Sequence, residues 1–206
     1  MKNILIITFL VCFRLEALAQ PGITGGSSFT NYILKKNGSK QSRNSIITYN
    51  VGLVYRTKGK SFCLQPGVEY SIKGTQNYDT PLGSGLDYYR NKLNYLQFTL
   101  PLIKKWELVK GISFDIGAGP YLSSLLKGTS TAHSFSGNDK ITNFKIGNDS
   151  TDGFRRMDGG ITFLFGCKLY HVGFYMLYDL GLANISPIKN EVIKTHDFRI
   201  NLSFYF

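Results

Sequence analysis

The final eleven residues, His196 to Phe206, read H-D-F-R-I-N-L-S-F-Y-F. From Phe198 onward, large apolar residues occupy every second position, with Arg199 and Asn201 among the residues between them. Successive side chains of a β-strand point to opposite faces, so this pattern predicts a strand with one apolar face and one mostly polar face. The predicted strand also ends on an aromatic residue.

The same alternation recurs upstream of this segment. We predict eight strands, at residues 22–29, 47–56, 62–73, 90–104, 112–124, 154–167, 172–182 and 196–206. The connections between them alternate in length. They are long at 30–45, 74–89, 127–151 and 184–195, and short at 57–60, 105–110 and 168–171.

The chain has 206 residues, the size of one domain, and 43% of them are hydrophobic. After the first twenty residues, no run is long and apolar enough for a membrane-spanning helix. Strands that alternate between a lipid face and a lumen face keep the mean hydropathy near zero, and here it is −0.08. We therefore predict an all-β fold, an eight-stranded antiparallel up-and-down transmembrane β-barrel with short periplasmic turns, long extracellular loops and both termini on the periplasmic side.

A soluble eight-stranded barrel such as a lipocalin is the alternative fold, with its apolar face pointing inward. Three features of the sequence oppose it. The apolar face is almost uniformly large, the alternating face is rich in glycine and other small residues as a narrow lumen requires, and the last strand is aromatic.

Residues 1–19 are predicted to form a cleaved signal peptide. Lys2 supplies its positive charge, Ile4 to Phe13 its apolar segment, and Ala17 to Ala19 an A-x-A cleavage site. Cys12 lies within the apolar segment, where it is not placed for lipid attachment. We expect an exported chain whose barrel domain spans residues 20–206.

Two cysteines remain in the predicted mature chain, Cys63 and Cys167. Cys63 alternates with the predicted outward residues Phe62 and Leu64, whereas Cys167 continues an outward series. Because the two thiols belong to opposite faces of strands that are not neighbours, we expect no disulfide between them.

Charged residues gather on the inward face of the predicted barrel. An eight-stranded barrel leaves an interior just wide enough for side chains to fill, so we expect these charges to pair and fill the lumen. A selective pore or a proton path is the functional alternative. The predicted network contains Arg56, Glu69, Lys73, Asp115, Asp158, Asp179 and Arg199, with Asp197 on the same face.

The formal net charge is +11. Lys35, Lys36, Lys40 and Arg43 cluster in one predicted extracellular loop, which is either simply solvated or in contact with anionic lipopolysaccharide headgroups. No helix-turn-helix, zinc or aromatic-basic motif accompanies them, so we expect no nucleic-acid partner.

Groups suited to catalysis are scarce. His133, Ser134, Ser136 and Asp139 include the residue types of a hydrolase triad, but they share one polar loop in which nothing rigid orients them. The lumen aspartates are explained by salt-bridge partners rather than by acid-base or metal chemistry. We predict no catalytic residues, no cofactor and no metal site.

Six short motifs run in order along the chain: G-I-T-G-G-S-S-F (22–29), P-G-V-E-Y-S-I-K-G (66–74), N-Y-L-Q-F-T-L-P-L-I-K (94–104), G-A-G-P-Y-L-S-S-L-L (117–126), D-G-G-I-T-F-L-F-G (158–166) and Y-D-L-G-L-A-N-I (178–185). Together they resemble the PorT-like outer-membrane β-barrel family of Bacteroidota. The resemblance implies a porin-like barrel of about eight strands in outer-membrane lipid. The member that gives this family its name is similar to a component needed for type IX protein secretion. The family has no catalytic residues that could be transferred to this sequence.

The closing strand is similar to the last strand of bacterial outer-membrane barrels, which the barrel-assembly machinery reads. We expect Phe204 and Phe206 to form that signal. The function favoured by the sequence is a non-enzymatic outer-membrane barrel with a structural or interaction role, its loops around Lys35, Asp79 and His133 facing outward. Secretion-system proteins are candidate partners, and a small porin-like passive pore for ions or solutes is the alternative function.

Overall fold

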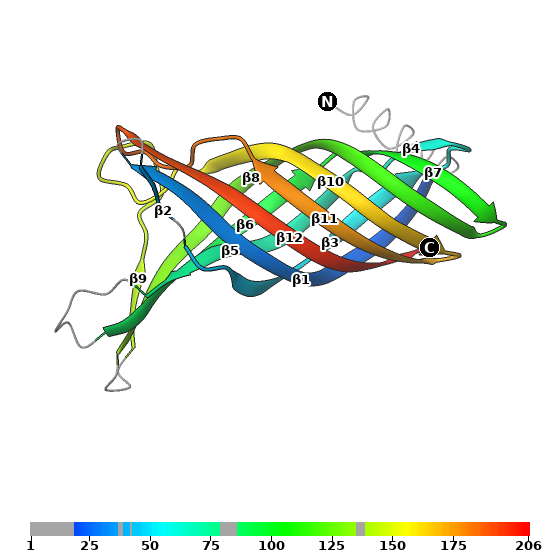
Figure 1. Ribbon diagram of the computed structural model, residues 1–206. Helices are drawn as coiled ribbons and strands as arrows, with labels where there is room; N and C mark the ends of the chain where they lie inside the picture. Colours follow the sequence, from blue (N-terminus) through cyan, green and yellow to red (C-terminus); the bar gives the residue numbers. More distant parts are fainter. Residues whose placement is uncertain (1–18, 37–38, 42, 79–85, 135–138) are drawn as a thin grey trace, which may run out of the picture.

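The computed structural model describes residues 19–36, 39–41, 43–78, 86–134 and 139–206, which form a closed β-barrel (Figure 1). The predicted signal peptide up to residue 18, Asp79 and Ser136 lie outside the described residues. No helix within the described ranges is long and apolar enough to cross a membrane.

The described residues form twelve strand segments, all in one sheet. Two pairs of segments are single wall strands interrupted at Pro66 and at Pro101, where proline has no N–H to donate to the ladder. The segments are β1 (Ala19–Lys36), β2 (Ser39–Gln41), β3 (Ile46–Thr57), β4 (Phe62–Leu64), β5 (Gly67–Asn77), β6 (Leu86–Thr99), β7 (Leu102–Val109), β8 (Ile112–Ser134), β9 (Lys140–Asn143), β10 (Met157–Leu169), β11 (Val172–Gly181) and β12 (Glu191–Tyr205).

The wall is a ring of eight antiparallel strands. Its order is β10-β11-β12-β1-β3-β5-β6-β8, and pairing of β8 with β10 closes it. The first and last strands also pair with each other, from Gly22 opposite Tyr205 to Lys36 opposite Glu191. Closure satisfies the backbone groups that an open sheet edge would leave unpaired in hydrocarbon. The predicted all-β, eight-stranded antiparallel fold is confirmed.

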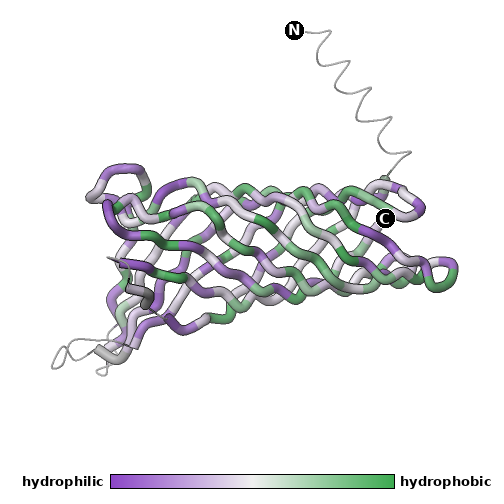
Figure 2. Tube along the Cα trace, turned by 45° about the horizontal axis from the view of Figure 1, so that its top comes forward, coloured by the Kyte–Doolittle hydropathy of each residue, from purple (hydrophilic) through white to green (hydrophobic). Residues whose placement is uncertain are grey.

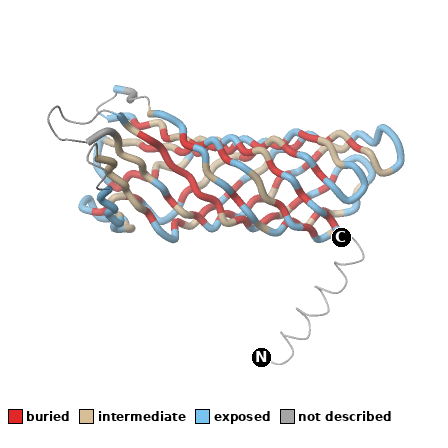
Figure 3. Tube along the Cα trace, turned by 90° about the horizontal axis from the view of Figure 1, so that it is seen from below, coloured by how far each residue is buried: buried red, intermediate tan, exposed pale blue. Residues whose placement is uncertain are grey.

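The closing strand shows the predicted two-faced pattern. Arg199 and Tyr205 are fully buried inside the barrel, while Leu202 is 59% and Phe206 63% exposed on the outer wall. Figure 2 shows hydrophobic and hydrophilic residues alternating along the strands, and Figure 3 shows the matching alternation of buried and exposed positions. An apolar outer wall is the reverse of the arrangement in a soluble barrel.

The first described residue, Ala19, and the C-terminal Phe206 lie at the end of the barrel that carries the short turns. Ala19 pairs with Thr57, and the Phe206 amide donates to Pro21 O at 2.8 Å. Gly111 has φ +86° in the turn between β7 and β8, a backbone conformation that glycine adopts without a steric penalty. We call the end of the barrel with the short turns the short-turn end, and the opposite end the long-loop end.

Several strands are longer than the alternation predicts. β1 continues to Lys36, β6 begins at Leu86, β8 continues to Ser134, and β9 lies within the predicted loop 127–151. Trp106, predicted in a turn, belongs to β7. In β1 the inner face stays buried as far as Leu34. In residues 129–134 of β8, by contrast, neither face is buried, so the side chains there show no alternation although backbone pairing continues.

Candidate functional site

All eight charged residues assigned to the lumen are almost completely buried. None exceeds 3% exposure, although each is a residue type that is rarely buried without a partner. They form two groups at different heights in the barrel, one around Arg199 and Lys73 and the other around Arg56.

Arg199 is the centre of the larger group. Its Nη2 donates to Asp179 Oδ1 at 2.9 Å and its Nη1 donates to Glu69 Oε2. Its Nε lies 3.8 Å from Asp197 Oδ2. A single guanidinium therefore connects β12 with β11 and, across the lumen, with β5.

Lys73 extends this group toward the opposite wall. Its Nζ lies 3.4 Å from Asp158 Oδ2 and 4.0 Å from Asp179 Oδ2. Neutral side chains complete the hydrogen bonding: Gln97 Nε2 donates to Asp179 Oδ2 at 2.7 Å, and Thr195 Oγ1 donates to Asp158 Oδ2 at 2.8 Å. The group thus links β5, β6, β10, β11 and β12 through ion pairs and hydrogen bonds inside the barrel.

The smaller group lies nearer the short-turn end. Arg56 Nη1 donates to Asp115 Oδ2 at 2.7 Å and to the Tyr175 hydroxyl at 2.8 Å. Asp115 also accepts from Tyr175 at 3.0 Å and from Ser113 at 3.1 Å. The structure thus brings β3, β8 and β11 together around one buried carboxylate.

Two apolar layers accompany the charged groups. The layer near the long-loop end includes Phe154 and Ile185, which lie between the wall strands. The layer near the short-turn end includes Cys63 and Leu164. The remaining buried members are Tyr32, Leu34, Leu93, Tyr95, Leu125 and Ile193 in the first layer, and Val54, Ile103, Tyr175, Leu177 and Tyr205 in the second.

The alternation in the sequence does not reveal that the connections between strands contribute side chains to the first apolar layer. Phe154 was predicted to begin a wall strand, but β10 begins at Met157 and the Phe154 ring packs edge-on against Phe144 at 4.9 Å. The Ile185 carbonyl accepts from Arg155 N at 2.8 Å and holds the two connections together. The presence of Phe144, Phe154 and Ile185 in otherwise polar connections was the one sequence feature that could have indicated this packing.

A family model described as "Outer membrane protein beta-barrel domain" matches residues 17–186. The chain belongs to this outer-membrane β-barrel family. Membership implies the bacterial outer membrane as its location. Among curated proteins, none matches the sequence significantly.

Three solved outer-membrane proteins are similar in fold. Ail, the attachment invasion locus protein of Yersinia pestis, is 11% identical, with 92% of this chain and 99% of Ail covered at a TM-score of 0.43. Neisserial surface protein A is 12% identical, with 91% and 99% covered and a TM-score of 0.45. OprG of Pseudomonas aeruginosa is 12% identical, with 92% and 96% covered and a TM-score of 0.47.

The basic cluster of this outer-membrane barrel lies at the long-loop end. Lys35 and Lys36 are exposed on the last part of β1, where β2 pairs with them, so Lys35 is opposite Lys40. Arg43 is half-buried, and its carbonyl accepts from Asn31 Nδ2 at 2.7 Å. Three of the four residues therefore belong to a strand pair rather than to a loop.

The two C-terminal phenylalanines of the barrel face outward. Phe204 is 45% exposed and Phe206 is 63% exposed, with their ring centroids 5.4 Å apart. Phe204 pairs in register with Val172 of β11. The rings belong to the same outer surface as the other large apolar side chains of the wall.

Of the residues considered for catalysis, the structure brings His133 and Asp139 together. His133 Nδ1 lies 2.8 Å from Asp139 Oδ2, and the Tyr88 ring stacks on the imidazole at 4.1 Å between centroids. Tyr88 and His133 pair on the extension of β6 and β8 beyond the wall, and Asp139 directly precedes β9. The described residues contain no group of ligands suited to a metal ion, and Cys63 and Cys167 are both free thiols.

Proposed function

We propose that this protein is a non-enzymatic outer-membrane barrel with a structural or interaction role and a closed lumen. The observation that carries the proposal is the Arg199 group, in which one buried guanidinium bonds Asp179 and Glu69 from different walls. One apolar layer lies near the long-loop end, and a second, which includes Tyr175, accompanies the Arg56 group. An eight-stranded interior filled in this way has no room for a continuous aqueous path.

Conductance separates this proposal from a small porin-like pore. The purified protein in planar lipid bilayers should show no steady single-channel current. Ion-selective current that changes when Glu69 or Asp115 is replaced by the neutral amide would contradict the closed lumen and favour the pore.

The long-loop end is the interaction surface in this proposal, with the short turns in the periplasm and a signal peptide directing export. Support comes from the unequal connections and from the extension of β6, β8 and β9 past the barrel (Figure 1). Ile141 on β9 is 69% exposed there. The basic residues Lys35 and Lys36 of β1 lie at the same end of the barrel and suit contact with anionic lipopolysaccharide headgroups.

We propose more specifically that the protein bound at this surface belongs to a protein-secretion system of the PorT type. Its support is the order of sequence motifs alone, because a fold does not define a function. Crosslinking in intact cells followed by identification of the attached proteins tests it. Secretion components among the attached proteins are expected, and a barrel crosslinked to none of them would contradict this role.

We also propose that Phe204 and Phe206 are read by the barrel-assembly machinery. Exposure of both rings on the outer wall supports direct recognition of the last strand. Replacing Phe206 by alanine should slow assembly in cells while leaving spontaneous folding into lipid vesicles intact. Equal slowing of both processes would instead indicate a role in stability.

A further inference from the structure

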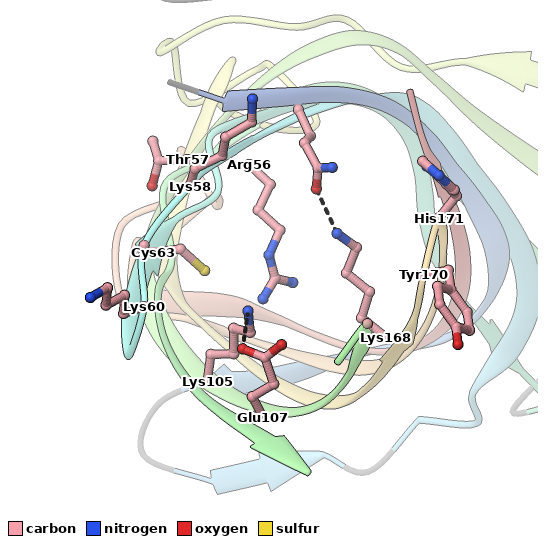
Figure 4. A pocket seen from close by; sticks show the side chains of 13 residues that line it. Arg56, Thr57, Lys58, Lys60, Cys63, Lys105, Glu107, Lys168, Tyr170 and His171 are labelled. Carbon is pink, nitrogen blue, oxygen red and sulfur yellow. Dashed lines mark hydrogen bonds and ion pairs between the residues drawn. The ribbon is translucent and has the colours of Figure 1, made fainter. Parts of the chain in front are cut away.

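A cavity of about 540 Å³ opens at the short-turn end of the barrel. Its lining comes from β1, β3, β4, β7 and β10 and from the short turns, and Figure 4 shows Arg56, Lys105 and Lys168 pointing toward its centre. This volume is in the range of small-molecule sites. We call it the basic mouth.

Positive charge dominates the basic mouth. Five lining residues are cationic, Arg56, Lys58, Lys60, Lys105 and Lys168, whereas Glu107 is the only carboxylate among the described lining residues. Glu107 Oε2 lies 3.3 Å from Lys105 Nζ, and the buried Asp115 pairs with Arg56, so two of the five cations are neutralised. The remaining excess is positive, so the mouth should concentrate anions.

Lys168 is held by neutral groups. Its Nζ donates to Gln20 Oε1 at 2.6 Å and lies 4.8 Å from the centroid of the Tyr205 ring. Gln20 belongs to β1 and Lys168 to β10, so the contact fixes the ammonium inside the mouth instead of in bulk water. An ammonium has three donors, and those not used by Gln20 are suited to an incoming acceptor.

The Arg56 side chain is an independent indication that the basic mouth binds an anion. Its side chain is 96% buried, and Nη1 already bonds Asp115 and Tyr175. Its Nη2 is buried without a hydrogen-bond partner among the described residues. A buried donor left without a partner is costly, and a guanidinium edge is shaped for carboxylate or phosphate oxygens.

We propose that the basic mouth binds a small soluble oxyanion, a phosphate or carboxylate compound, with Arg56 Nη2 and Lys168 Nζ as its donors. The mouth lies inside the ring of strands, whereas phospholipids contact the outside of the wall, which favours a soluble ligand over a lipid headgroup. The Arg56 group and its apolar layer form the floor. The ligand therefore binds without crossing the barrel.

Calorimetric titration with pyrophosphate, using the protein in phosphatidylcholine nanodiscs, tests the proposal. Replacing Lys168 by glutamine should weaken binding at least about tenfold, since a charged hydrogen bond contributes roughly 1.5–3 kcal/mol. Lys36→Gln removes the same charge at the opposite end and should leave the affinity within about twofold. Citrate is titrated in the same way as a carboxylate ligand. The proposed site would be overturned if the wild type and both variants bound with equal affinity, or if both substitutions weakened binding equally. It would also be overturned if neither pyrophosphate nor citrate bound.

Two further measurements complete the test. Lys105→Gln should also weaken binding, and it avoids the folding risk of replacing Arg56, whose loss would leave Asp115 buried without its cation. Nanodiscs that contain phosphatidylglycerol distinguish the source of the oxyanion. Unchanged pyrophosphate affinity supports a soluble ligand, whereas competition by this lipid would show that headgroups occupy the mouth and would overturn the assignment to a solute.

Discussion

Lys73 Nζ lies 3.4 Å from Asp158 Oδ2, and both side chains are completely buried in the lumen. Lys73 belongs to β5 and Asp158 to β10, which are separated by β6 and β8 along the ring. The pair therefore joins opposite parts of the wall. Tyr121 lies beside it, with the ring centroid 4.4 Å from Lys73 Nζ.

Replacing Lys73 by methionine should strongly destabilise the barrel. The change leaves Asp158 and Asp179 buried near each other without this cation, and removing one partner of a buried pair typically costs about 3–5 kcal/mol. Urea unfolding in lipid vesicles measures the loss. Lys36→Met is the matched exposed control, and Lys73→Met combined with Asp158→Asn should recover part of the stability. A Lys73→Met midpoint equal to wild type would contradict the buried pairing.

Replacing Leu202 by arginine tests whether the outer wall of the barrel faces lipid. This side chain is 59% exposed on β12, and arginine on a lipid-facing strand costs about 2–4 kcal/mol near the bilayer midplane. The free energy of folding into vesicles should fall accordingly. Ile141→Arg is the control, because Ile141 is 69% exposed on β9 beyond the wall and should tolerate the change. A spin label at Leu202 that reported a packed protein interior would refute the lipid-facing assignment.

Alanine at Gly111 should weaken the turn between β7 and β8. Gly111 has φ +86°, and a Cβ there would lie 2.7 Å from Tyr170 Cδ1. Strain of this kind costs about 1–3 kcal/mol, measurable as a lower unfolding midpoint. Gly159→Ala is the control, because its Cβ would meet its nearest neighbour, Tyr121 O, at 3.4 Å. Equal midpoints for both variants would show that the turn tolerates a side chain.

Alternation in the sequence was sufficient to place Arg199 and Lys73 inside the barrel, because a strand has only two faces. It could not pair them, because which residues meet across a lumen depends on the stagger of strands around the ring. Arg199 bonds Glu69 although 130 residues separate them. Nor did alternation reveal that Phe154 is buried in the first apolar layer, or that Arg56 Nη2 has no hydrogen-bond partner among the described residues, since both arise from packing in three dimensions.

The connection between β9 and β10 contains an ion pair that should respond to acid. Lys145 Nζ lies 3.1 Å from Asp152 Oδ1, and the Asp149 amide donates to Asp152 Oδ2 at 2.9 Å. The ammonium, and after it the amide, lowers the pKa of the Asp152 carboxyl below its ordinary value. A lowered folded-state pKa means that the stabilisation is present above the ordinary aspartate value, about 3.9, and is lost as the pH falls through the folded value.

Carbon NMR titration of the Asp152 carboxyl in detergent micelles measures this pKa directly. Lys145→Met should raise the pKa of Asp152 toward its ordinary value, because the first cause of the shift is removed. Lys140→Met on β9 is the control, since Lys140 is exposed and forms no ion pair with Asp152 among the described residues. An Asp152 pKa that is the same in the wild type and in Lys145→Met would assign the shift to the Asp149 amide alone and contradict the ion pair.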